Sequence, residues 1–415
     1  MSTRHLPVRP NLEQLRHQAK DLLSDIHAGK LPALDDLHHF HPESLAVEDV
    51  KLADAQLTLA RSYGASSWPR LVNACQMTDA IWRGDIDTVR SLILKDPKLL
   101  TEAARGVEDH NWGPPMSYAA NVGQNEIISM LQSLGAADIQ HAFDRACLQG
   151  KIKTAHLLLG MGARPLPGCV MGPCETLNPQ GLKLLFELGA ELTDAEGDLL
   201  APIALVLEVY ARNPSGKHEC LALIEQRGVE FPDTPAMAFH RGRIDLLEKH
   251  LAKDPFLLSR TFSHEEIYPP ELGCHADHTL ALHGTPIADS TLLHMCVDFD
   301  EIEIAHWAFE NRADVNALAK VDSDGFGGHS ALFGCVVSQP YRCGRQKDGS
   351  FTRLLLDHGA NPNIHASLRK ELRFVVDQTL HEYRNVTPIT WGRQFHDQDW
   401  VNPAAMRLIA QAGGV

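Results

Sequence analysis

Hydrophobic residues in this chain recur three and four positions apart in short runs, and many of these runs close on a Gly-Ala pair. Four examples are SMLQSLGAAD ending at Asp138, HLLLGMGARP ending at Pro165, KLLFELGAEL ending at Leu192 and RLLLDHGANP ending at Pro362. This spacing predicts short amphipathic helices, and a glycine directly after a helix favours a left-handed cap. One such helix is too small to bury its own apolar face, so we expect the units to stack.

The glycines that end these helices are unevenly spaced. Gly135, Gly162 and Gly189 follow one another at intervals of 27 residues, whereas Gly228 comes 39 residues after Gly189. The extra length lies at ARNPSGKHE, which predicts a connection after a helix that ends near Arg212. The stack is therefore expected to be irregular.

Residues 1–75 carry no Gly-Ala pair and are expected to form a helical cap. The run NLEQLRHQAKDLLSDIHAG has Asn11 as its N-cap and stops at Gly29, and the run VKLADAQLTLARSYG stops at Gly64. Trp68 follows, and we expect it to pack against both helices. A cap of this kind shields the otherwise exposed apolar face of the first repeat.

A second level of repetition relates residues 80–100 to residues 238–258. The two segments, AIWRGDIDTVRSLILKDPKLL and AFHRGRIDLLEKHLAKDPFLL, are identical at ten positions. Both contain Lys-Asp-Pro, where proline cannot continue the helical hydrogen bonds, so each helix is expected to stop there. We therefore divide the repeats into a first block, 76–236, and a second block, 237–415.

Composition narrows the choice of partners and compartment. The chain has 38 Lys and Arg against 53 Asp and Glu, a net charge of -15, so binding to DNA or RNA is not expected. Its nine cysteines are scattered, and several lie in apolar helical runs, which is typical of the reducing cytoplasm. The first 20 residues contain no apolar core suited to a signal peptide, so none is expected, and no stretch approaches the roughly 20 apolar residues of a membrane span. We expect a soluble cytoplasmic protein without membrane contact.

Several turns resemble the ankyrin repeat, in which a Thr-Pro-Leu-His turn opens the inner helix of each pair. The segment STLLH at 290–294 keeps the Thr and the His, TPI at 387–389 keeps the Thr-Pro start, and DHGANPN at 357–363 resembles the family's outer-helix ending. The resemblance covers residues 76–415. It implies an all-α ankyrin-repeat solenoid of stacked antiparallel helix pairs with irregular, enlarged finger loops. The segment before it resembles the helical segment that precedes ankyrin repeats in many bacterial proteins, which implies a bacterial source.

The second block has gained a long insertion at about 259–290. Loops of this length in compact domains are usually either functional or disordered. The apolar residues of this insertion are not typical of a disordered segment, so we expect an ordered flap over a groove. His275, Asp277 and His278 within it are candidate ligands of a divalent metal. The alternative is a solvated polar loop, and no other cofactor is indicated.

A glycine-rich turn, DSDGFGGH at 322–329, precedes a further inner helix. Asp322, Asp324 and His329 from this turn, together with His294, are the candidates for acid/base work or metal binding if the chain is an enzyme. The alternative is a finger turn in which Asp and Gly serve turn chemistry alone.

Five further residues at finger or inner-helix positions are candidate ligand-binding residues: His110, Trp112, Tyr341, Trp391 and Arg393. Tryptophan near the start of an inner helix can stack on a ligand or anchor a partner. The alternative for each is ordinary packing.

No nucleotide-binding loop and no catalytic motif occurs in the sequence. The ankyrin resemblance implies a protein that binds a protein partner in a groove lined by inner helices and fingers. The alternative is an enzyme or small-molecule binder, such as a metal- or His/Asp-dependent hydrolase or lyase, whose pocket in the second block is closed by the insertion. A structure can distinguish these two hypotheses. An enzyme needs several titratable groups around one enclosed cavity, whereas a binding array presents an open, continuous surface.

Overall fold

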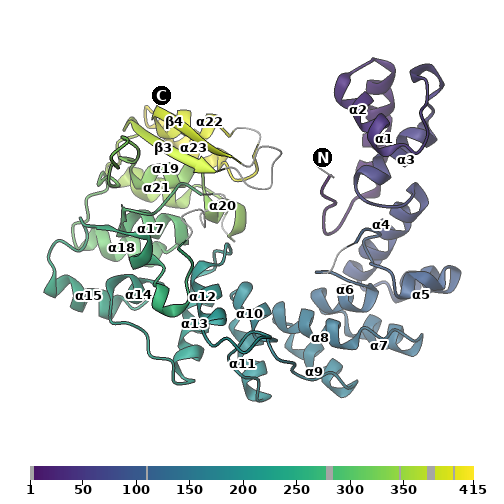
Figure 1. Ribbon diagram of the computed structural model, residues 1–415, viewed down its shortest axis with the longest axis horizontal. Coiled ribbons are helices and arrows are strands. Elements are labelled where there is room, and N and C mark those ends of the chain that lie inside the picture. The colour runs from purple at the N-terminus through teal and green to yellow at the C-terminus, as the bar shows by residue number, and fades with distance from the viewer. Residues whose placement is uncertain (1–3, 109–110, 277–283, 345–346, 372–378, 396–397) are drawn as a thin grey trace. The chain divides into compact units, whose positions relative to one another are not determined.

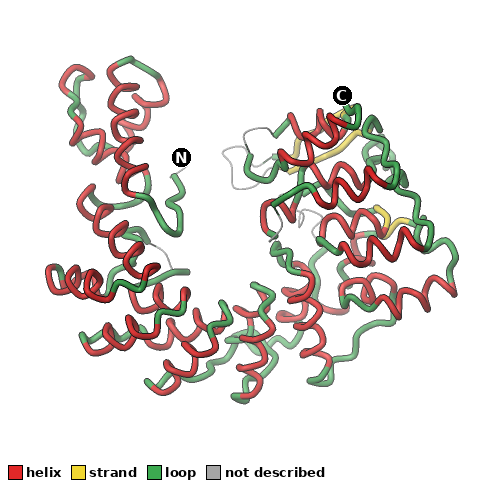
Figure 2. The backbone as a smooth tube through the Cα atoms, turned by 180° about the vertical axis from the view of Figure 1, so that it is seen from behind, coloured by secondary structure: helices red, strands yellow, loops and turns green. Residues whose placement is uncertain are grey.

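The computed structural model describes residues 4–108, 111–276, 284–344, 347–371, 379–395 and 398–415. This part of the chain is mostly helical, and its strands form two small sheets of two strands each (Figures 1 and 2). Contacts divide the chain into two compact units, Met1–Leu166 and Pro167–Val415. The helical class is confirmed, whereas the small sheets are an addition that the helical periodicity does not predict.

The first unit begins with α1 (Leu12–His27), α2 (Leu31–Phe40), a 3-10 turn at Val47–Asp49 and α3 (Leu52–Ser62). Asn11 caps α1 as predicted, because its side chain accepts a hydrogen bond from the Gln14 amide at 3.0 Å. Trp68 packs against the apolar clusters of α1 and α3, also as predicted. Helix α2 is not predicted by the sequence pattern, because only Ala33 and Leu37 are buried along it.

Helix pairs follow in the first unit: α4 (Trp68–Arg83) with α5 (Ile86–Lys95), α6 (Pro115–Val122) with α7 (Asn125–Ser133), and α8 (Ile139–Leu148) with α9 (Ile152–Gly160). Helix α6 packs against α4 and α8, so the first helices of the pairs form one row. Helix α7 packs against α5 and α9, which form the second row (Figure 1). Helix α5 ends directly before the Asp-Pro of its Lys-Asp-Pro triplet, as expected, and a 3-10 turn at Pro97–Leu100 follows.

The second unit is built in the same way from α10 (Met171–Glu175), α11 (Pro179–Glu187), α12 (Ala201–Glu208), α13 (Pro214–Glu225), α14 (Pro235–His240), α15 (Ile244–Lys253), α17 (Leu292–Phe299), α18 (Ile302–Glu310), α19 (Ala331–Val336), α21 (Ser350–Asp357), α22 (Pro388–Arg393) and α23 (Pro403–Gln411). Consecutive members of this series pack as pairs, and α20 (Gln339–Cys343) packs against α17. Helix α12 ends at Glu208 rather than near Arg212, because Val209 leaves the helical conformation with a ψ of 143°.

The Gly-Ala pairs end α7, α9, α11 and α21 with one common cap. Their glycines have positive φ angles between 85° and 105°: Gly135, Gly162, Gly189 and Gly359. In each pair the alanine amide donates back to the last turns of the helix at 2.9–3.0 Å, which satisfies a carbonyl at the helix end. Arg312 holds the corresponding position after α18 with a φ of 66°, and Ala313 makes the same hydrogen bond to Ala308 at 2.9 Å.

Part of the 259–290 insertion has regular structure. Its two ends are joined by β1 (Thr261–Phe262) and β2 (Ser290–Thr291), which pair antiparallel, and between them lie α16 (His264–Ile267) and a 3-10 turn at Pro270–Leu272. Apolar side chains of the insertion are buried, as an ordered segment requires: Phe262, Ile267, Tyr268 and Leu272. Helix α16 packs on α14, so this part of the insertion is fixed to the helix pairs.

The other sheet is a hairpin of β3 (Ala366–Glu371) and β4 (Leu380–Val386) that packs on α22. Alternate residues of β3 are buried, but Lys370 is one of them, so hydrophobicity alone does not reveal the strand. Gly327 of the glycine-rich turn pairs with Ser367 at the start of β3, and its amide donates to the Ser367 carbonyl at 2.6 Å. The hairpin therefore holds the turn at 322–329 in place.

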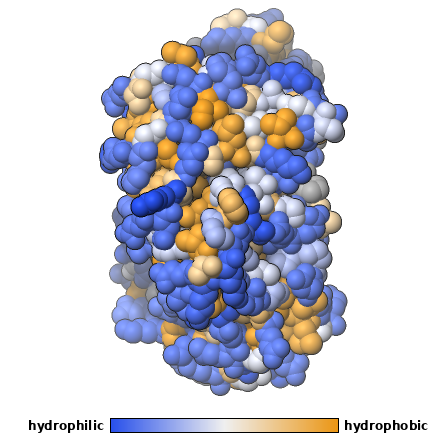
Figure 3. All heavy atoms as spheres, turned by 90° about the vertical axis from the view of Figure 1, so that its left-hand side faces the viewer, coloured by the Kyte–Doolittle hydropathy of each residue, from blue (hydrophilic) through white to orange (hydrophobic). Residues whose placement is uncertain are grey.

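Large hydrophobic side chains that remain exposed are distributed over both units. Examples are Leu94, at 65% exposure on α5, and Phe256, at 74% exposure after α15. On the face in Figure 3, hydrophobic residues form small groups interrupted by hydrophilic ones. Such mixing is ordinary for a protein surface.

Candidate functional site

His294 is held inside the fold by both of its ring nitrogens. Nδ1 lies 2.9 Å from the Thr291 hydroxyl, and Nε2 donates to the carbonyl of His329 at 3.0 Å. The side chain is 4% exposed, and burial lowers its pKa to about 4. Through these two contacts, His294 connects the start of α17 to the glycine-rich turn that contains His329. The Thr and the His of the 290–294 segment therefore have a structural role.

His329 lies beside it and is equally enclosed. Its Nε2 donates to the Pro286 carbonyl at 2.9 Å, and its ring meets that of His294 edge to face with centroids 5.3 Å apart. Burial, with a smaller effect of His294, lowers the pKa of His329 to about 3. The structure brings the two histidines together, but both imidazoles are neutral and buried, so neither can reach a substrate in this conformation.

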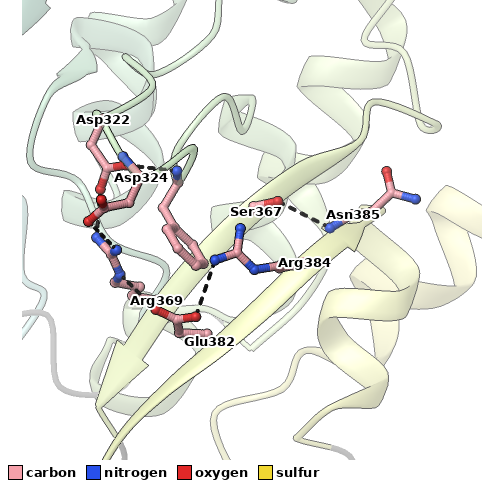
Figure 4. A network of polar contacts seen from close by, with 8 residues as sticks. Asp322, Asp324, Ser367, Arg369, Glu382, Arg384 and Asn385 are labelled. Carbon is pink, nitrogen blue, oxygen red and sulfur yellow. Dashed lines mark hydrogen bonds and ion pairs between the residues drawn. The ribbon is translucent and has the colours of Figure 1, made fainter.

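Asp322 and Asp324 bind the hairpin instead (Figure 4). Their carboxylates accept hydrogen bonds from the Arg369 guanidinium of β3 at 2.6 and 2.7 Å. Asp322 also accepts from the amides of Phe326 and Asp324, and these hydrogen bonds with the Arg369 charge hold its pKa below the usual value. Arg369 and Arg384 stack on Phe326, with guanidinium carbons 4.0 and 4.2 Å from its ring centroid. These contacts favour the alternative in which both aspartates serve only to hold the conformation of the turn.

The candidate ligand-binding residues lie in different environments. Trp391 is fully buried against Tyr383 and Phe395, and its indole donates to Thr285 at 3.0 Å, so it cannot stack on a ligand here. The ring fills the core beside the hairpin, which favours the alternative of ordinary packing for this residue. Arg393, two residues further along α22, is exposed.

Tyr341 and Trp112 are half-buried. The Lys347 ammonium lies 5.6 Å from the Tyr341 ring, and the Trp112 ring lies 5.0 Å from that of Tyr118. His110 lies outside the described residues. Trp112 and Tyr341 therefore belong to different compact units.

Of the three predicted metal ligands, only His275 lies within the described residues. The backbone amide of His275 donates to one oxygen of the Glu208 carboxylate, and His275 Nδ1 lies 2.7 Å from the other. Asp277 and His278 lie outside the described residues. Within the described ranges, no three His, Cys, Asp or Glu side chains are grouped closely enough to hold a metal ion.

A cluster of buried charges in the second unit is absent from the sequence predictions. Arg212 donates to Asp298 at 2.7 Å, and the two side chains are 3% and 4% exposed. The Lys217 ammonium lies 3.5 Å from the carboxylate of Glu301, and both are similarly buried. Burial lowers the pKa of Lys217 to about 8, against the opposing attraction of Glu301.

Neighbouring rings complete this cluster. Phe299 packs under both cations, with Arg212 and Lys217 at 4.5 and 4.2 Å from its centroid. His240 Nδ1 lies 3.3 Å from the Lys217 ammonium, while its Nε2 donates to the Ile267 carbonyl of the insertion at 2.8 Å. Burial and the Lys217 charge lower the pKa of His240 well below its usual value, so this histidine stays neutral.

A pocket of about 530 Å³ opens beside this cluster, between the start of α13, the turn before α15 and the start of α18. Titratable residues line it: Arg212, His218, Asp300, Glu301 and Glu303. His218 Nε2 lies 2.8 Å from the Glu301 carboxylate, and Gly242 leaves room for the His218 ring, since a Cβ there would come within 2.3 Å of it. The lining contains no residue of the insertion, so the described insertion does not close this pocket.

One sequence feature could have revealed the cluster. Lys217 shares a helical face with Cys220, Leu221 and Ile224, at the i, i+3, i+4 and i+7 positions, and all four are buried in α13. A lysine in an apolar stripe requires a partner from elsewhere in the fold. Its partner, Glu301, cannot be identified from the sequence because it lies in another helix pair.

The first unit carries a different feature along α4, α6 and α8. The Trp82 indole donates to the Tyr118 hydroxyl at 2.8 Å, and the Arg9 guanidinium lies 5.8 Å from the Trp82 ring. Arg145 donates to Asn121 at 3.1 Å. We call the group Arg9, Trp82, Trp112, Tyr118, Asn121 and Arg145 the Trp82 face. Its exposed members are Arg9 and Trp82, whereas Tyr118 and Asn121 are buried and hold Trp82 and Arg145 in place.

No family model and no curated protein matches this chain. None of the described helices combines the length and the apolar character needed to cross a membrane.

Proposed function

We propose that this chain is an ankyrin-like repeat array that binds a protein partner. Three observations support the repeat assignment: the packed helix pairs, the shared Gly-Ala cap, and the Thr291–His294 contact at the start of α17. The pattern of turn and helix resembles that of ankyrin repeats, and stacked pairs present a row of first helices for binding. The charge of -15 supports a protein rather than a nucleic acid as the partner.

The observation that carries this proposal is the Trp82 face. Trp82 is 40% exposed although it is a large aromatic residue, and its hydrogen bond to Tyr118 holds the indole in one orientation. Tryptophan, tyrosine and arginine are the residues that most often dominate the energy of protein interfaces. A fixed aromatic ring also loses little side-chain entropy on binding.

Site-specific photo-crosslinking tests the proposal. The photoreactive residue p-benzoylphenylalanine replaces Trp82 in the full chain inside cells, and we expect one covalent adduct of defined mass. The same residue at Leu94 is the control, because Leu94 is 65% exposed but lies on α5 in the second row. Adducts that are identical at both positions, or absent at Trp82, would contradict the proposal.

Affinity measurements with the identified partner then test whether that partner binds at the Trp82 face or elsewhere on the surface. We expect Trp82→Ala to weaken binding by about 30-fold, corresponding to about 2 kcal/mol, as for an interface hot spot. Leu94→Ala should leave the affinity unchanged. Equal effects of the two substitutions would show that binding occurs elsewhere.

A further inference from the structure

The pocket beside the buried charge cluster has an unbalanced charge. Arg212 is neutralised by Asp298 at 2.7 Å, and Lys217 by Glu301 at 3.5 Å. The carboxylates of Asp300 and Glu303 also line the pocket, and neither forms an ion pair within the described residues. The pocket therefore carries about two uncompensated negative charges when both are ionised.

Glu301 adds a hydrogen-bond acceptor without a donor. Its Oε1 atom takes both the His218 contact at 2.8 Å and the Lys217 contact at 3.5 Å. Its Oε2 atom accepts no hydrogen bond from the described residues, although the side chain is only 3% exposed. This oxygen is not among the fully buried atoms that lack a hydrogen-bond partner, so it is open to the pocket that Glu301 lines, where the N–H group of a ligand can donate to it.

The lining also contains apolar side chains, beside the polar residues Asn213, Ser215 and His218. Pro214, Ile244, Ile302 and Ile304 surround the acidic residues. Aliphatic side chains of this kind pack against methylene groups, while the carboxylates hold a charged end. A carbon chain that ends in an ammonium group satisfies both kinds of surface.

We propose that this pocket binds a primary alkylammonium group. The ammonium donates to Asp300 and to Glu301 Oε2, Glu303 attracts it from the rim, and the alkyl chain packs against the isoleucines. The group belongs either to a small free amine or to a lysine side chain of a protein. This inference is independent of the Trp82 face, which lies in the other compact unit.

Calorimetric titration of the full chain with Nα-acetyl-lysine methylamide tests the proposal. We expect saturable binding, and we expect the Nε-acetylated form of the same probe, which has no charge, to bind at least tenfold more weakly. A parallel titration with pentylamine distinguishes the two sources. Equal affinities indicate a free amine, and tighter binding of the lysine probe indicates a protein side chain.

Charge-removing variants locate the binding. Asp300→Asn and Glu303→Gln should each weaken binding of the lysine probe about tenfold, because each removes one attraction at short range. Asparagine tolerates the φ of 62° at position 300, so the first variant keeps the backbone. Glu310→Gln is the matched control, since Glu310 is an exposed acid at the far end of the same helix, α18, and should change nothing.

The proposal is overturned by any of three results. These are the absence of saturable binding to the unmodified chain, equal binding of the acetylated probe, and unchanged affinity in both pocket variants. Circular dichroism and thermal unfolding of each variant establish that it is folded before its titration is interpreted.

Discussion

At the scale of single residues, the backbone conformation at helix ends explains the most regular feature of the sequence. A glycine ends α7, α9, α11 and α21 because a residue with φ near 90° suffers no side-chain strain only when it lacks a Cβ. Space is not the reason, since a Cβ at these glycines would meet no atom within 4 Å. Arg312 shows that the same cap can form with a side chain present, at a cost in backbone strain.

Exchanging the residues at two of these caps should change stability in opposite directions. We expect Arg312→Gly to raise the free energy of unfolding by about 1 kcal/mol and Gly359→Ala to lower it by about 1 kcal/mol. Urea unfolding followed by circular dichroism measures both. A decrease with Arg312→Gly would mean that the Arg312 side chain makes a stabilising contact that outweighs the strain.

The buried histidines should make the fold sensitive to acid. Burial lowers the pKa of His294 from 6.5 to about 4, so below pH 6.5 the unfolded chain binds a proton that the folded chain does not. The stability contributed by the neutral imidazole is therefore fully present above pH 6.5 and is lost progressively as the pH falls towards 4. The loss from His294 reaches about 3 kcal/mol at pH 4.

Unfolding by urea at pH 7 and at pH 5 measures this effect. The drop in unfolding free energy between the two should be smaller in His294→Gln than in the unmodified chain, even though the variant is less stable at pH 7. His156, which is exposed on α9, provides the control: His156→Gln should leave the drop unchanged.

At the scale of elements, the hairpin and the glycine-rich turn support each other. Arg369 joins them, because its guanidinium contacts Asp322 and Asp324 (Figure 4) and its central carbon lies 4.0 Å from the ring centroid of Phe326. Each exposed ion pair alone contributes little, but several charges on one guanidinium hold a common geometry. The sequence offered the two aspartates as catalytic candidates, and the contacts of β3 explain them as anchors of a turn.

Loss of the guanidinium should loosen the turn locally. In Arg369→Met, which keeps an aliphatic stem, we expect the amides of Asp324 and Phe326 to exchange with deuterium about five- to tenfold faster, a change of about 1 kcal/mol in local opening. Amides in α17 should keep their rates. Unchanged exchange at both turn amides would show that backbone pairing between Gly327 and Ser367 is sufficient.

At the scale of the whole molecule, contacts between distant segments determine the charged centre of the second unit. Arg212 and Asp298 lie 86 positions apart in the chain and form a buried ion pair. The attraction in such a pair roughly offsets the cost of removing both charges from water, whereas a single buried charge is strongly destabilising. The pair is therefore a constraint on which segments can pack together.

Removing one partner should cost much more than removing both. We expect Asp298→Leu to lower the free energy of unfolding by about 3 kcal/mol, because Arg212 then remains buried without its counter-ion. The double variant Arg212→Met with Asp298→Leu should recover at least half of that loss. Chemical denaturation measures the stability of both variants. Arg212 also donates to the backbone carbonyls of Val209 and Asp298, both at 2.7 Å. Equal stabilities of the two variants would indicate that these hydrogen bonds stabilise the buried guanidinium instead.

The sequence by itself determined the local features of this protein. Helix faces, the Asn11 cap, the Gly-Ala caps and the stop before Pro97 follow from side-chain periodicity and from backbone preferences that act over four or five residues. The same information misses α2 and the β3–β4 hairpin, where the buried positions are few or include a lysine.

Only the tertiary structure decided which polar residues meet. His294, His329, Asp322 and Asp324 have the chemistry of a catalytic site, yet their hydrogen bonds tie turns together, and Trp391 lies in the core. The pocket residues Asp300 and Glu301 stood in the sequence without any motif, beside an apolar helix. The physical reason is that periodicity records which side of a helix is buried, whereas the partner of a buried charge depends on packing between segments tens of residues apart.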